Sequence, residues 1–113
     1  MFNFFSSKKE IIPEVLIALR WKFPDKVNVE VRKSEDGGYF AIVKNLPGCI
    51  TQAEKGQELF EMVNDAIYTY LDVPPQYIPH MPAFLPPEEI RKKLNNIEIP
   101  EFILQEGIVL QRT

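Results

Sequence analysis

The chemistry that this sequence could perform depends first on its single cysteine and its single histidine. Cys49 follows a Pro-Gly pair in "LPGC", and His80 lies in a proline-rich stretch. A cysteine nucleophile needs a neighbouring base that lowers its pKa, and His80 could supply one only if its stretch folds back over Cys49. Free cysteine is among the most buried residue types, so we predict that Cys49 is structural.

The carboxylates are scattered along the chain rather than grouped. They fall in four separate places: Glu30 on the first predicted strand, Glu35 and Asp36 in the turn, Glu54 before the long helix, and Asp65 on the polar face of that helix. Two-metal catalysis needs carboxylates that converge from adjacent strands, and one histidine with one cysteine cannot complete a zinc site without carboxylates. Gly37 and Gly38 do not precede a helix, so they form no phosphate-binding loop. We therefore predict no catalytic residues, no metal and no cofactor.

The chain that would position these residues has the length and composition of one ordinary globular domain. The chain has 113 residues, of which 45% are hydrophobic and 26% charged, and its formal net charge is -3. This charge argues against a surface built to bind nucleic acid. A single cysteine excludes a disulfide framework, so we expect a cytoplasmic protein. Pro13, Glu14 and Arg20 interrupt the N-terminal apolar stretch. We therefore expect neither a signal peptide nor a membrane span there.

Hydrophobic periodicity predicts an α+β fold with a small antiparallel sheet. Apolar residues at helical spacing indicate an N-terminal helix over 11–22. Alternating valines from Val27 and the turn residues "SEDGG" predict a hairpin over 27–44. A short third strand, "CITQ", follows, and then the strongest helical pattern, over 57–71. The continuous apolar run "YFAIVK" in the hairpin indicates that both of its faces are covered, and another subunit is one candidate for that cover.

The last third of the chain begins with a proline-rich arm over 73–86. Its prolines exclude a regular helix and a central strand, yet it carries too much apolar area for a disordered linker. We expect an extended segment that lies against the domain or a partner. A C-terminal helix over 86–96 follows, with proline at its entry, acids early and bases late. Two apolar stretches around Gln105–Gly107 predict one or two final strands.

The order of motifs in the middle of the chain resembles the HicB-like family. The hairpin, "DGGYFAIVKNLPGCITQ" and an amphipathic helix with acids near its start follow one another over residues 27–71. The resemblance implies a strand-strand-strand-helix-strand unit with a partial ribonuclease H-like topology. It also implies an antitoxin, which binds a small HicA-like ribonuclease toxin and blocks its RNA-cleaving site. Lys55-Gly56 stands where members often have a Thr or Ser helix cap.

Residues and resemblance together predict a protein-binding module rather than an enzyme. We expect a homo-oligomer that sequesters a partner through side chains of the proline-rich arm, since extended arms bind by laying side chains into grooves and pairing with sheet edges. The predicted contact residues are Tyr77, Ile78, Met81, Phe84 and Leu85. The alternatives are a residual nuclease or cysteine hydrolase and a DNA-binding autoregulator. The short, helix-poor C-terminus argues against the autoregulator.

The domain organisation follows from these elements. Residues 1–10 are predicted to be a tail, and residues 11–113 a single HicB-like domain that comprises the core (27–71), the proline-rich arm (73–86) and the C-terminal helix and strand (86–113). Three aromatic residues in the tail, Phe2, Phe4 and Phe5, are unusual for a solvated segment. We expect them to fold back onto the domain or a neighbouring subunit, or to anchor the chain to a membrane surface or partner.

Overall fold

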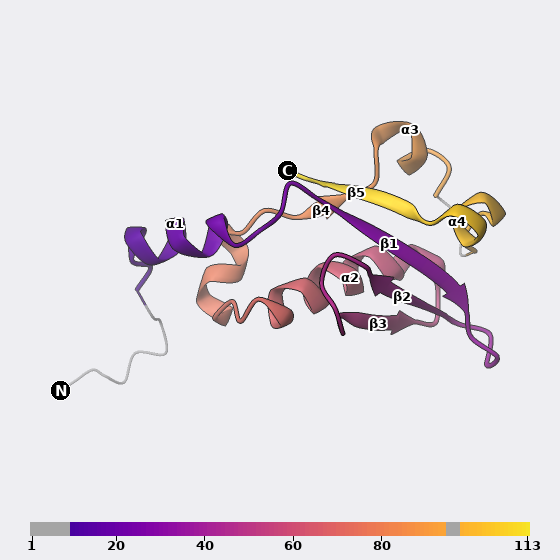
Figure 1. The fold of residues 1–113 in the computed structure, drawn as a ribbon, viewed down its shortest axis with the longest axis horizontal. Helices are drawn as coiled ribbons and strands as arrows, with labels where there is room; N and C mark the ends of the chain where they lie inside the picture. The colour runs from indigo at the N-terminus through magenta and orange to yellow at the C-terminus, as the bar shows by residue number, and fades with distance from the viewer. Residues whose placement is uncertain (1–9, 95–97) are drawn as a thin grey trace.

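The chain folds into a five-stranded antiparallel sheet with helices, as the α+β prediction required. The computed structural model describes residues 10–94 and 98–113. The strands lie in the order β3-β2-β1-β5-β4, and every neighbouring pair is antiparallel (Figure 1). A ribonuclease H-like topology is not confirmed. The strand that follows the long helix in the chain, β4, lies at the far edge, and β5 pairs with β1 in its place.

The predicted hairpin is confirmed and sets the register of the sheet. β1 spans Lys26–Lys33 and β2 spans Tyr39–Val43, with Val31 opposite Ala41. The turn between them closes through a hydrogen bond from the Ser34 N–H to the Gly38 carbonyl (2.7 Å). Gly37 takes a φ of 100°, which only glycine adopts without strain. The buried side chains of both strands lie on one face of the sheet, so the alternation predicted the core correctly.

The third strand and the long helix follow as predicted. β3 spans Ile50–Ala53 and pairs with β2, and α2 spans Gly56–Tyr70. Helix α2 packs on β2 and β3, and it buries Leu59, Val63 and Ile67 completely. No side chain caps its N-terminus at Lys55. The stability of α2 therefore comes from its apolar face rather than from its entry.

The N-terminal helix α1 (Pro13–Trp21) confirms the helix predicted over 11–22. It lies beyond the end of the sheet, beside the proline-rich segment (Figure 1). The Ile12 N–H donates to the Tyr77 hydroxyl (3.0 Å), and the Arg20 guanidinium donates twice to the His80 carbonyl (3.1 and 2.8 Å). The three tail phenylalanines lie outside the described residues.

The C-terminal third corrects one prediction and decides between the alternatives of another. The helix expected over 86–96 is the single turn α3 (Glu88–Arg91), and Asn95 and Asn96 lie outside the described residues. The first apolar stretch after it is a helix, α4 (Glu101–Glu106), and not a strand. Pro100 supplies the extended N-cap residue, and Ile103 buries its side chain completely. Only the second stretch is a strand, β5 (Ile108–Arg112).

Candidate partner-binding surface

The proline-rich segment, which was predicted to lie against the domain or a partner, packs into the protein's own core. It forms a 3-10 helix, η2 (Pro75–His80), and a two-residue strand, β4 (Phe84–Leu85). Of the five predicted contact residues, Tyr77, Met81 and Phe84 are buried, Ile78 is half-buried and Leu85 is 36% exposed. In this conformation the three buried side chains offer little surface to another molecule. Whether a partner contacts any of the five stays a prediction.

The side chain of Asn64 on α2 holds this segment in place. Its Oδ1 accepts a hydrogen bond from the Phe84 N–H (2.6 Å), and its Nδ2 donates to the Phe84 carbonyl (2.9 Å) and to the Phe60 carbonyl (2.8 Å). The Phe84 ring stacks on Phe23 with a centroid separation of 6.0 Å. The Tyr68 hydroxyl adds a bond to the Pro82 carbonyl (3.0 Å). These bonds hold the segment against the C-terminal half of α2, and we call residues 75–85 the strap.

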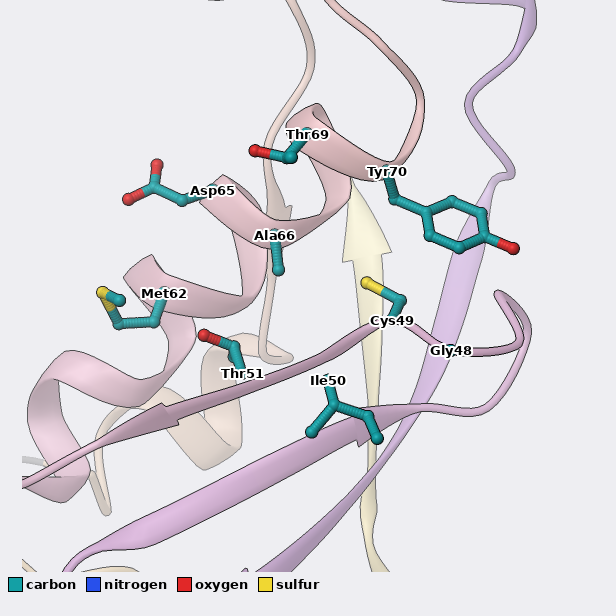
Figure 2. A pocket seen from close by; sticks show the side chains of 9 residues that line it. All are labelled: Gly48, Cys49, Ile50, Thr51, Met62, Asp65, Ala66, Thr69 and Tyr70. Atoms are coloured by element: carbon teal, nitrogen blue, oxygen red, sulfur yellow. The ribbon is translucent and has the colours of Figure 1, made fainter.

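Cys49 lies where a structural cysteine is expected. It is 4% exposed, and its sulfur points into the space between β3 and α2 (Figure 2). Burial raises the pKa of the Cys49 thiol, which keeps the sulfur protonated at neutral pH. His80 lines a different hollow, with Arg20 and Arg112, whereas the hollow beside Cys49 contains no histidine. The structure therefore does not bring the two residues together as a dyad.

The described residues offer neither a cluster of metal ligands nor a membrane-spanning helix. Within residues 10–94 and 98–113, no three His, Cys, Asp or Glu side chains gather where they could hold a metal ion. No helix in those ranges is long and apolar enough to cross a membrane.

The outer edge of β3 presents main-chain groups that the sheet does not use. The Val43 N–H donates to the Cys49 carbonyl (2.9 Å), so Cys49 and Thr51 are the residues whose main chain faces β2. In an antiparallel ladder the alternate residues point their N–H and C=O groups the other way. Those of Ile50 and Gln52 therefore point outward, and no other strand among the described residues pairs with β3.

A shallow groove runs between this edge and α2. It consists of two adjoining hollows of about 370 and 440 Å³, which share Ile50, Thr51 and Met62 as lining residues. Thr51 points toward α2, and Ile50 points to the opposite side of the strand (Figure 2). Ile50 is 58% exposed, and the side chains of Met62 and Tyr70 are also exposed. We call these residues, together with the outward main chain of Gln52, the β3 edge groove.

The flank of α2 along this groove is acidic. Helix α2 contains three acids, Glu58, Glu61 and Asp65, and no lysine or arginine. Asp65 lines the groove together with Met62, and Glu58 precedes Met62 by one helical turn and so lies on the same stripe. All three carboxylates are exposed. The groove therefore combines open main-chain groups, apolar side chains and negative charge.

A second exposed apolar surface lies on α1. Trp21 is 83% exposed, and Ile17 next to it is also exposed. Both residues line a hollow of about 460 Å³ with Phe23 and Arg112. Sequence periodicity predicted the helix but could not show that the other described residues leave Ile17 and Trp21 exposed.

Comparison with known proteins gives a relative that matches part of this chain. The chain is 48% identical over 48 residues to a protein described as "UPF0150 protein" from the archaeon Archaeoglobus fulgidus, and the match covers 42% of this chain and 70% of that relative. The chain belongs to the UPF0150 family. No protein-family model and no solved structure matches it.

For this UPF0150 family member, the sequence did not reveal two features that the structure makes prominent. The first is the contact of Asn64 with Phe84, because these two residues lie twenty positions apart in the chain. The β3 edge groove depends on which residues of β3 bond to β2, and that follows from the hairpin register. The sequence held one sign of an open edge. Edge strands are commonly protected by charge or proline, and "ITQA" contains neither.

Proposed function

We propose that this protein is a cytoplasmic, HicB-like, antitoxin-type binding module that sequesters a partner protein. The first candidate partner is a HicA-like ribonuclease toxin, since residues 27–71 resemble the HicB-like family. The observation that carries the proposal is the β3 edge groove: the hairpin, "LPGC" corner and long helix form a unit whose last strand keeps its outward main-chain groups open. Such an edge is a ready template for pairing with another polypeptide.

The chemistry of the described residues also favours binding over the enzymatic alternatives. The Cys49 thiol is buried with a raised pKa, which is the opposite of what a nucleophilic cysteine needs. A homo-oligomer, in which another copy covers part of the exposed apolar surface, belongs to the same proposal.

The test begins with the neighbouring reading frames. A frame that encodes a short basic protein with a histidine would be expressed alone and together with this protein, and cleavage of a labelled RNA would be measured. We expect cleavage by the basic protein alone and its loss when this protein is added in equimolar amount. RNA cleavage that this protein does not suppress would contradict the antitoxin role.

The same preparation tests the alternatives. Metal-dependent nuclease turnover by this protein alone would favour the residual enzyme, and salt-dependent binding to its own promoter DNA would favour the autoregulator. The mass of the free protein in solution measures the oligomeric state.

A further inference from the structure

The two edges of the sheet differ in how their outward main-chain groups are satisfied. At β4, the Thr113 N–H donates to the Ala83 carbonyl, so the main chain of Phe84 faces away from β5. The side-chain amide of Asn64 accepts from the Phe84 N–H and donates to its carbonyl, as the main chain of a neighbouring strand would. At β3, the equivalent groups of Ile50 and Gln52 have no such partner among the described residues.

The surroundings of the β3 edge suit an added strand. Ile50, Thr51, Gln52 and Ala53 carry no charge, and no proline interrupts them, so nothing in the strand itself opposes pairing. The groove beside it offers Ile50 on one side of the sheet and Met62 and Tyr70 on the other. A strand that paired with β3 would place its alternate side chains against these two sets.

The acidic flank of α2 decides what kind of strand fits. An added strand would run alongside Met62, with Glu58 and Asp65 on the same stripe of the helix. No basic residue within α2 offsets these charges. A second copy of this chain paired through β3 would bring two such acidic flanks together, and like charges at close range oppose association. A strand that carries lysine or arginine would be attracted instead.

We propose that the β3 edge groove binds an extended, basic segment of a partner protein, which pairs with β3 as a sixth strand. The main chain of Ile50 and Gln52 supplies the hydrogen bonds, Ile50, Met62 and Tyr70 supply apolar contact, and Glu58 and Asp65 select positive charge. The proposal rests on the proposed function in taking the ligand to be a protein, and it adds the surface and the chemistry of the partner.

The probe is a short synthetic peptide in which lysine alternates with valine or threonine, titrated into the full-length, 15N-labelled protein. We expect saturable binding with a dissociation constant of about 1 mM or tighter. Amide hydrogen exchange should slow at Ile50 and Gln52, while Thr51, whose main chain already faces β2, should be slow before and after. A matched peptide with glutamate for lysine should bind at least about tenfold more weakly.

Two variants test the two parts of the site. Gln52→Pro removes an outward N–H without touching the β2–β3 ladder, and we expect about a tenfold loss of peptide affinity from the lost bond and the ring at the edge. The double variant Glu58→Lys with Asp65→Lys should cause a loss of similar size that shrinks as salt is added. The matched control, Glu88→Lys with Glu89→Lys on α3, makes the same charge change on another element and should leave affinity unchanged. Folding of every variant is checked by its amide spectrum.

Three results would overturn the proposal. The first is that the lysine peptide shows no saturable binding up to about 1 mM, and the second is that it slows amide exchange only outside β3, for example at Trp21. The third is that the free protein is already a dimer with slow exchange at Ile50 and Gln52. The last result would assign the edge to a second copy.

The outcome is separable from the toxin test. If Gln52→Pro suppresses RNA cleavage as well as the unmodified protein, the site is wrong and the antitoxin role stands. If the peptide binds at β3 and no toxin is suppressed, the antitoxin role is wrong and the binding site stands.

Discussion

The two edges of this sheet show two ways in which a protein treats an exposed strand. β4 is two residues long, prolines lie on both sides of it, and Asn64 occupies the outward main chain of Phe84. β3 is twice as long, uncharged and free of proline, and its outward groups face a groove. Natural proteins usually protect such edges because they pair readily with other chains. On the proposal made above, the closed edge serves folding and the open edge serves binding.

The largest effect that tests this comparison is the loss of the side chain that anchors β4 in the core. Phe84→Ala removes a fully buried ring that stacks on Phe23, and we expect a loss of about 3–5 kcal/mol in the free energy of unfolding. The matched change at the next residue, Leu85→Ala, removes a side chain that is one third exposed and should cost less than about 1.5 kcal/mol. Urea denaturation measures both. Equal losses would mean that β4 does not anchor the strap.

The second effect comes from opening the closed edge. Asn64→Ala leaves the Phe84 N–H and carbonyl without their partner, and we expect a loss of about 2–4 kcal/mol in the free energy of unfolding. Amide exchange at Phe84 should become faster. Gln57→Ala, at an exposed position of the same helix, should change stability by less than about 0.5 kcal/mol. An unchanged exchange rate at Phe84 would show that Asn64 is not what closes this edge.

The third effect separates the two sides of β3. Thr51→Pro removes an N–H that faces β2 and should cost about 2–3 kcal/mol. Gln52→Pro removes an N–H that faces outward and should cost less than about 1 kcal/mol, since proline is tolerated on the free side of an edge strand. Thermal unfolding of the two variants measures the difference. If Gln52→Pro proves the more damaging change, the main-chain alternation assigned to this edge is reversed.

The same contrast explains how much could be predicted from the sequence. The hairpin, the third strand and α2 follow from local periodicity and turn chemistry, and the burial of Cys49 follows from the usual burial of free cysteine. The structure confirms all four. The strap depends instead on one polar side chain, Asn64, that meets the main chain of Phe84 twenty residues later, and no periodic pattern records such a contact. The apolar residues of the proline-rich segment predicted contact with a partner, and the sequence did not show that three of them, Tyr77, Met81 and Phe84, are buried in the core.

A similar limit applies to the end of the chain. "EFILQE" has an apolar run that suits a strand or a short helix equally well, and the choice depends on Pro100 before it and the buried site that Ile103 fills. The open edge of β3 could be predicted in part. Its residues were predicted as a strand, but the outward direction of Ile50 and Gln52 required the register with β2.

The smallest effect tests whether the open edge is also a loose one. Cys49 precedes β3 directly, and burial raises the pKa of its thiol, so alkylation by iodoacetamide at pH 7.5 should be at least about tenfold slower than in the urea-unfolded chain. Above about pH 8.5, the ordinary pKa of a thiol, the unfolded chain loses the Cys49 proton while the folded chain keeps it. Folding then binds a proton more tightly, so the free energy of unfolding should decline as the pH rises. This decline should be smaller in Cys49→Ala. Fast alkylation of the folded protein at neutral pH would mean that β3 separates from α2 without any partner, and the edge would then be frayed rather than held ready for a sixth strand.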